Sequence, residues 1–224
     1  MTRKRIALLI LLALLVVAVA TTAVACNKPQ DVTINVSEVT ETYDGQAHLA
    51  IASTSAGTFA WTGKSGGSWT VNYTDEKGNQ VDEPVNAGTY TASITFAKSG
   101  YKTVTATVTV VIEKATPTIL KWPTIKEEVA PYEIVYGESL DNSVLYPTEA
   151  NAAYVVGVDG EVVRGSFQWA SVTPTVSVGA YDINFVPAGS ASDENSYAHN
   201  YRSVSMSSTV AADHSGGSKM PVRV

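Results

Sequence analysis

The stretch VNAGTYTASITF at residues 85–96 is echoed by VSVGAYDINF at residues 176–185, roughly ninety positions later. Both contain Gly-x-Tyr and then continue with an apolar residue at nearly every second position. Successive side chains of a β-strand point to opposite faces, so each stretch predicts a strand that follows a tight bend and buries one face. No catalytic motif has this form. The echo therefore indicates two copies of one structural unit.

The same alternation runs through most of the chain after residue 30. Strands are expected within segments 31–39, 49–51, 69–73, 89–96, 102–112, 167–169 and 181–185, and a last strand near 198–211. Asp159-Gly160, between two Val-rich runs, predicts a hairpin with a two-residue type I′ turn. No amphipathic helix of useful length is predicted after the first 26 residues. These patterns predict an all-β protein.

The Gly-x-Tyr pairs have a specific structural interpretation. Immunoglobulin-like sandwiches place a Tyr near the start of a late strand, where its hydroxyl bonds back to the backbone upstream and forms a tyrosine corner. A glycine two positions earlier lets the chain turn tightly beneath the ring. Gly88 with Tyr90, and Gly179 with Tyr181, fit this arrangement. The expected fold is two tandem Ig-like β-sandwich domains after an N-terminal signal or anchor helix, with Trp69 or Trp61, and Trp169, as the buried rings opposite.

The first 26 residues have the three parts of an export signal. Arg3, Lys4 and Arg5 precede an unbroken apolar run at 6–20, which is followed by small residues up to Ala25. Apolar helices satisfy their own backbone in lipid, and the basic end stays cytoplasmic. The sequence therefore predicts an extracytoplasmic location.

Cys26 is the only cysteine, so neither domain can have an internal disulfide. Ala23-Val24-Ala25 fits ordinary signal peptidase, and with Cys26 it also resembles a bacterial lipobox. The resemblance implies a diacylglycerol thioether on Cys26 and attachment to the membrane through several acyl chains, which suffice for stable anchoring. A soluble secreted protein and an uncleaved N-terminal anchor remain the alternatives.

Charge argues against nucleic acid as a partner. The formal net charge is −6, and all three charges in the first 26 residues are basic. The remainder holds 12 basic and 21 acidic residues, a net of −9, without a cluster of Lys or Arg.

No residue pattern predicts catalysis or a cofactor. The three histidines are His48, His199 and His214. None has a second ligand at metal spacing, so no metal site is predicted. The letters Gly-x-Ser-x-Gly occur once, at residues 63–67, but no helix is predicted after them, so the strand-to-helix turn of a nucleophile elbow is not expected there. The loop acids Asp193 and Glu194 would offer oxygens to calcium, but the EF-hand spacing is missing, and solvated loop acids are the expected reading.

One aromatic residue is a candidate for ligand binding. Trp61 lies in a Gly/Ser-containing insertion at 59–68, which would present its ring to solvent at one end of a sandwich. An exposed ring face suits the apolar face of a sugar. A carbohydrate-binding surface module is therefore the alternative function, with most other Trp and Tyr residues expected in the cores.

Several segments together resemble the MBG-type Ig-like repeats of bacterial surface proteins. These are YDGQ (43–46), NAGTYTASITF (86–96), GYKTVTATVTVVIEKATPTI (100–119), VYGESL (135–140) and GSFQWA (165–170). The resemblance implies an exported spacer, scaffold or adhesive module without catalytic residues or cofactor, whose partners would be the membrane, glycans or other surface proteins. The expected organisation is a signal peptide (1–26), a tether (27–30), a first Ig-like domain (31–113), a linker (114–118), a second Ig-like domain (119–212) and a flexible tail (213–224).

Overall fold

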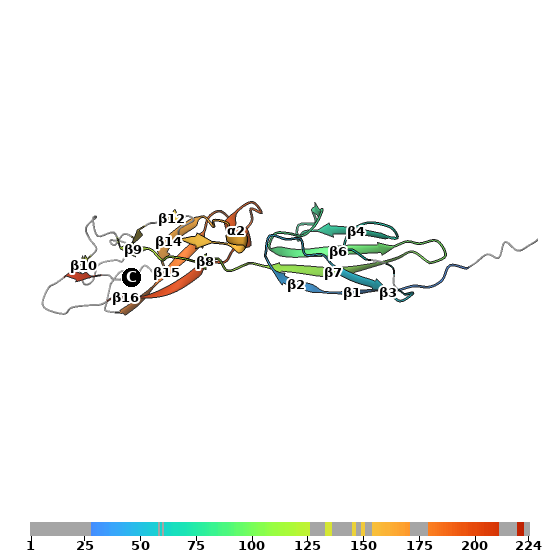
Figure 1. Cartoon of the computed structure of the whole chain (residues 1–224), viewed down its shortest axis with the longest axis horizontal. Helices are drawn as coiled ribbons and strands as arrows, with labels where there is room; N and C mark the ends of the chain where they lie inside the picture. The colour runs from blue at the N-terminus through green and yellow to red at the C-terminus, as the bar shows by residue number, and fades with distance from the viewer. Residues whose placement is uncertain are drawn as a thin grey trace, which may run out of the picture.

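The computed structural model describes residues 28–57, 59, 61–125, 133–135, 145–146, 149–150, 154–170, 179–210 and 219–221. Strands dominate these residues, and their only helical elements are the four-residue helix α2 (Tyr197–Asn200) and the 3₁₀ turn η2 (Val158–Gly160). The protein is therefore all-β, as the alternation predicts. The strands form two units placed end to end (Figure 1). We call them the N-terminal unit (residues 28–113) and the C-terminal unit (residues 118–221).

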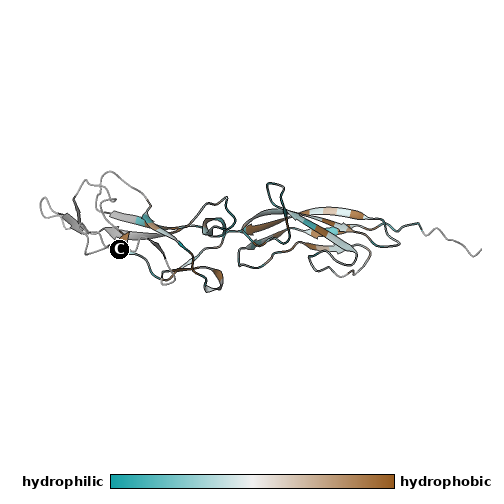
Figure 2. Ribbon diagram, turned by 90° about the horizontal axis from the view of Figure 1, so that it is seen from above, coloured by the Kyte–Doolittle hydropathy of each residue, from teal (hydrophilic) through white to brown (hydrophobic). Residues whose placement is uncertain are grey.

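The N-terminal unit has two sheets. Its strands are β1 (Ile34–Ser37), β2 (Val39–Thr42), β3 (Ile51–Thr54), β4 (Trp69–Thr74), β5 (Gln80–Val81), β6 (Gly88–Phe96) and β7 (Val104–Glu113). Five of them form a sheet in the order β2-β7-β6-β4-β5, and β1 pairs with β3 in a second sheet. All pairs are antiparallel except β2 with β7. Polar and apolar segments both occur along these strands (Figure 2).

Strand β6 is the centre of this core, as its sequence predicts. Tyr90, Ala92, Ile94 and Phe96 are all buried, the last three completely, whereas Thr91 between them is exposed. The partner strand β7 buries Val108, Val110 and Ile112 with the same period. Side chains of β1, β2, β3 and β4 complete one hydrophobic cluster, so the two sheets share a core. Burying each such large side chain contributes about 1.5–3 kcal/mol.

The C-terminal unit contains shorter strands. They are β8 (Thr118–Ile119), β9 (Thr124–Ile125), β10 (Glu133–Val135), β11 (Leu145–Tyr146), β12 (Glu149–Ala150), β13 (Val155–Val156), β14 (Gly165–Trp169), β15 (Gly179–Pro187), β16 (Val204–Val210) and β17 (Lys219–Pro221). The main sheet has the order β12-β14-β15-β16, and the pairs β8 with β13, β9 with β11 and β10 with β17 are separate. The hydrophobic core of the C-terminal unit includes Val155, Val163, Phe167, Ile183 and Phe185.

The predicted two-residue hairpin turn at Asp159-Gly160 is wrong. Val156 pairs with Val162, and the Gly157 N–H donates to the Glu161 carbonyl, so the connection spans five residues and contains η2. The turn differs because it contacts a residue distant in sequence, Tyr201. The Val158 N–H donates to the Tyr201 hydroxyl at 3.1 Å instead of across the hairpin.

The last long strand also begins later than predicted. Helix α2 occupies residues 197–200, and β16 starts only at Val204. This short helix lies at the end of the C-terminal unit that faces the N-terminal unit (Figure 1). Its last residue, Asn200, is 8% exposed and contacts Asn86 and Ala87 of the N-terminal unit.

Candidate functional site

The junction between the two units is built on the first Gly-x-Tyr pair. The Tyr90 hydroxyl donates to the Asn86 carbonyl at 2.8 Å, four residues upstream. Gly88 has a φ of +156°, which L side chains rarely adopt, and a Cβ at this position would lie 3.5 Å from the Tyr90 ring. Burial raises the pKa of Tyr90, and the carboxylates of Glu194 and Asp75 raise it further. The bond fixes the backbone at Asn86 and Ala87, the segment that meets the C-terminal unit.

Asn200 closes the junction from the other side. Its Oδ1 accepts from the Ala87 N–H at 2.8 Å, and its Nδ2 donates to Asn86 Oδ1 at 2.9 Å. The Asn200 carbonyl also accepts from the Ala115 N–H in the linker at 2.9 Å. Ala87 and Ala115 are nearly fully buried. One amide side chain therefore satisfies buried polar groups of the N-terminal unit while its backbone holds the linker.

The first two residues of the linker, Lys114 and Ala115, are hydrogen-bonded to the C-terminal unit. Lys114 Nζ donates to the Ala198 carbonyl at 2.6 Å, and the Arg202 guanidinium donates to the Lys114 carbonyl through Nε at 3.1 Å and through a terminal nitrogen at 2.5 Å. The Arg202 N–H donates to the Ala115 carbonyl at 2.9 Å. Pro117 is buried and has a restricted φ. The predicted linker at 114–118 is thus part of the packed structure.

Two aromatic rings meet beside this hydrogen-bond network. Tyr43 of the N-terminal unit and Tyr201 of the C-terminal unit pack edge to face, with centroids 5.5 Å apart. Tyr43 packs against both hydrophobic clusters. The two cores are therefore joined through this pair, in a geometry that favours aromatic packing.

Two open clefts flank the junction. One, of about 210 Å³, lies between the loop at 75–77, the Tyr90 region and the loop at 191–194. The other, of about 330 Å³, lies between Tyr43, η2 and α2. Glu194 borders both. Acidic groups predominate at their rims, but among the described residues no three His, Cys, Asp or Glu side chains group closely enough to hold a metal ion.

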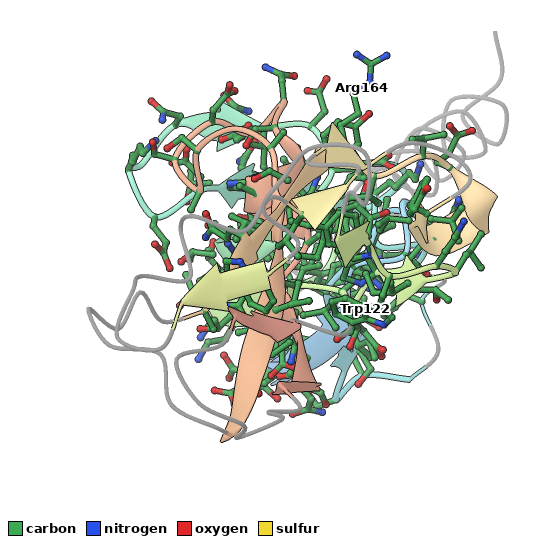
Figure 3. All side chains as sticks on the ribbon, turned by 90° about the vertical axis from the view of Figure 1, so that its left-hand side faces the viewer. Trp122 and Arg164 are labelled. Atoms are coloured by element: carbon green, nitrogen blue, oxygen red, sulfur yellow. The ribbon has the colours of Figure 1, made fainter. Side chains whose placement is uncertain are left out.

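The predicted ligand-binding residue Trp61 packs against other side chains of the N-terminal unit. It is half-buried, its Nε1 donates to the Ala50 carbonyl at 3.0 Å, and its ring packs against Trp69 with centroids 4.9 Å apart. Trp69 is 4% exposed, as expected of the buried ring. Trp122 likewise lies among the packed side chains of the C-terminal unit, while Arg164 points outward (Figure 3). The contacts of Trp61 with Ala50 and Trp69 therefore hold its indole within the fold.

The other predicted residues fall in three groups. Cys26, His214 and the side chain of Tyr181 lie outside the described part of the chain. His48 Nε2 lies 3.0 Å from Asp44 Oδ1, and His199 Nδ1 lies 2.7 Å from the Ala191 carbonyl, so each contacts its own loop. Gly179 opens β15 opposite Val210.

Sequence reasoning missed the residues that join the units. Asn86 lies within the motif at 85–96, and a tyrosine corner predicts a bond to backbone upstream of Tyr90, as its carbonyl makes. The contact of its side chain with Asn200 is not predicted. Asn200, Arg202 and Lys114 carry no sequence signal, because their partners are 84 to 114 residues away along the chain.

Comparisons with known proteins add no relatives. No protein-family model matches the chain, and no curated protein matches it. Within the described residues, no helix is both long enough and apolar enough to span a bilayer. The predicted signal segment precedes those residues.

Proposed function

We propose that the chain is a non-enzymatic, exported cell-envelope lipoprotein whose two Ig-like sandwich domains form a stiff spacer that holds an attached or bound partner away from the membrane. The observation that carries this proposal is the Asn200 junction. Domains in one chain normally move relative to one another unless their interface is extensive. Here a buried amide, the linker backbone and an aromatic pair all connect the two units, so bending requires these contacts to break together.

Two further features support the proposal. The hydroxyl of Tyr90 makes the bond expected of a tyrosine corner, which favours an Ig-like fold for the N-terminal unit. The signal-like segment and Cys26 favour export and lipid attachment. Trp61 is held by Ala50 and Trp69, so the carbohydrate-binding alternative gains no support from its position.

Stiffness is tested by measuring the distance between the two units. Spin labels at the exposed strand positions Thr107 and Gln168, in a Cys26→Ala background, report this distance by pulsed electron resonance. We expect a narrow distribution for the parent protein and a broad one for Asn200→Ala, because that variant leaves the buried Ala87 N–H unpaired at a cost of about 1–3 kcal/mol. Asn195→Ala, at an exposed loop position, is the matched control. A broad distribution in the parent protein would refute a stiff spacer.

Anchoring is tested separately. Mass spectrometry of the membrane-isolated protein should show an N-terminal Cys26 carrying acyl chains. An unmodified N-terminus at Cys26 or Asn27 would exclude lipid attachment.

A further inference from the structure

The N-terminal segment leaves the fold at the end of the molecule farthest from the C-terminal unit. The Gln30 N–H donates to the Gly100 carbonyl at 2.9 Å, and the Lys102 N–H donates to the Gln30 carbonyl at 2.9 Å. Residue 30 is thereby fixed beside the turn between β6 and β7. Figure 1 shows the blue N-terminal trace leaving the molecule at this turn. We call residues 28–33, Phe59 and 97–103 together the lysine tip.

The lysine tip is the positive end of an acidic unit. Residues 28–113 contain five lysines and nine acids. Three of the lysines (Lys28, Lys98 and Lys102) but only one of the acids (Asp31) belong to the tip. The tip therefore has a formal charge of +2, and the rest of the unit, with two lysines and eight acids, has −6. All three tip lysines are exposed, and Lys102 is paired with Asp31 at 2.5 Å.

A cluster of aromatic rings forms the base of the tip and contacts one of its lysines. Phe59 packs against Tyr101, with ring centroids 5.7 Å apart, and both rings contact the buried Phe96. Lys98 Nζ lies 4.3 Å from the centre of the Phe59 ring. Phe59 and Tyr101 are half-buried. This cation–π contact holds the Lys98 ammonium on the surface of the aromatic base while the side chain stays exposed, and aromatic rings next to cationic side chains suit a membrane–water interface.

The tether limits how far the tip can lie from the membrane. Gln30 lies four positions after Cys26, and an extended chain spans at most about 14 Å over that length. If Cys26 carries the lipid, the tip lies next to the headgroups of the leaflet in which the acyl chains are buried. This step rests on the proposed lipid attachment.

We infer that the lysine tip contacts anionic lipid headgroups and thereby orients the spacer on the membrane. The partner is a lipid surface because the positive patch surrounds the exit point of the membrane-attached segment, while the remaining acidic surface is repelled from the same charge. Each lysine near an anionic surface strengthens association by about fivefold, and the attraction falls off within about 8 Å at physiological salt.

The test measures how readily lysines are acetylated in the full chain, isolated from membranes and reconstituted in vesicles. One set of vesicles contains about one third phosphatidylglycerol, and the other contains only phosphatidylcholine. Lys98 and Lys102 should be acetylated at least threefold more slowly in the anionic vesicles. Lys77, an exposed lysine at the junction end of the same unit, is the internal control and should react equally in both. Raising the salt to 0.5 M shortens the screening length to about 4 Å and should remove the difference.

A matched pair of variants separates contact from general electrostatics. Lys98→Gln should reduce the protection of Lys102, whereas Lys77→Gln should leave it unchanged. Equal acetylation of Lys98 and Lys102 in both vesicle types, with the protein still floating with the vesicles, would overturn the tip contact and leave lipid attachment standing. Protein that fails to float with either vesicle type would overturn lipid attachment, and the tip contact with it.

Discussion

The two units share one strand pattern, but they differ in how their cores are closed. In the N-terminal unit, β6 and β7 pair over nine residues, and thirteen buried residues form one described cluster within residues 32–112. In the C-terminal unit, β15 and β16 pair over seven residues, and the described cluster has eight buried members. Two of these eight, Ala115 and Tyr201, lie at the junction.

This difference predicts a one-sided dependence, in which only the C-terminal unit needs its neighbour to stay folded. The buried cluster of the N-terminal unit comes entirely from that unit. The cluster of the C-terminal unit extends to the linker, and Tyr201 packs against Tyr43 of its neighbour. The contacts between the units stabilise both by the same amount. The C-terminal unit has the smaller described cluster, so it should unfold when its neighbour unfolds, whereas the N-terminal unit should stay folded without its neighbour.

The largest expected effect comes from truncating one core phenylalanine in each unit. Phe96 and Phe185 are both fully buried. Phe96→Ala and Phe185→Ala should each destabilise their own unit by about 3–5 kcal/mol, because the removed ring leaves a cavity. Phe96→Ala should also speed hydrogen exchange in the C-terminal sheet, whereas Phe185→Ala should leave the N-terminal sheet protected. Hydrogen exchange of the two main sheets measures both effects in one experiment, and equal, independent losses would contradict one-sided dependence.

The next effect concerns Gly157, which touches the junction from the C-terminal side. A Cβ at this position would lie 2.1 Å from the Tyr201 hydroxyl oxygen. Gly157→Ala should displace the Tyr201 ring, break its bond from the Val158 N–H and cost about 1–3 kcal/mol. Chemical denaturation of the C-terminal unit measures the loss. Gly66→Ala, where a Cβ meets no atom within 4 Å, is the control and should change neither unit.

A smaller effect distinguishes the two Gly-x-Tyr pairs. Tyr90→Phe removes the hydroxyl bond to Asn86 and should destabilise the N-terminal unit by about 0.5–1.5 kcal/mol. Tyr181→Phe should cost the C-terminal unit a similar amount if its corner is made in the same way. Thermal unfolding of both variants measures this. A loss for Tyr90→Phe alone would mean that the second unit is closed differently, and unchanged melting of both would reject the corner interpretation altogether.

The elements that follow from sequence are those set by local periodicity. The alternation in 90–96 predicts the buried face of β6 residue by residue, because the pleat alone decides which side chains point inward. The turn at Asp159-Gly160 was mispredicted because its geometry depends on Tyr201, a residue more than forty positions later. Local turn preference was overridden there by a tertiary hydrogen bond.

The junction is harder to predict, for a related reason. Asn200 lies in the run SYAHNYR, whose composition fits any exposed loop. Its burial results from docking against Ala87, 113 residues earlier. Trp61 illustrates the opposite error: the Gly/Ser-containing insertion suggested exposure, but the chain folds back so that the indole reaches the Ala50 carbonyl. Both cases depend on contacts between residues distant in sequence, which a periodic pattern does not report.

The smallest effect tests the loop of the N-terminal unit that borders the junction. Asp75 accepts hydrogen bonds from the side chain and backbone of Asn79 and from the backbone of Lys77, and the Asn79 side chain is the main reason that the pKa of Asp75 is lowered from 3.8. Because the pKa is lowered on folding, the ionised Asp75 stabilises the folded state above pH 3.8, and this stabilisation is lost as the pH falls through the folded-state pKa.

Asn79→Ala should therefore raise the pKa of Asp75 toward 3.8, as measured by carbon-detected NMR titration of the carboxyl group. Asp44 is the control in the same spectra, because its pKa is lowered mainly by the Gln46 backbone N–H and should not move. If Asp75 keeps its lowered pKa in the variant, the backbone donors alone organise the loop. The loop at 75–79, which borders the junction, would then be fixed by backbone donors of the N-terminal unit itself. Such a loop needs no contact from the C-terminal unit, as expected of a unit that stays folded alone. A joint rise of Asp44 and Asp75 would instead show that the substitution disturbs the whole junction end of the unit.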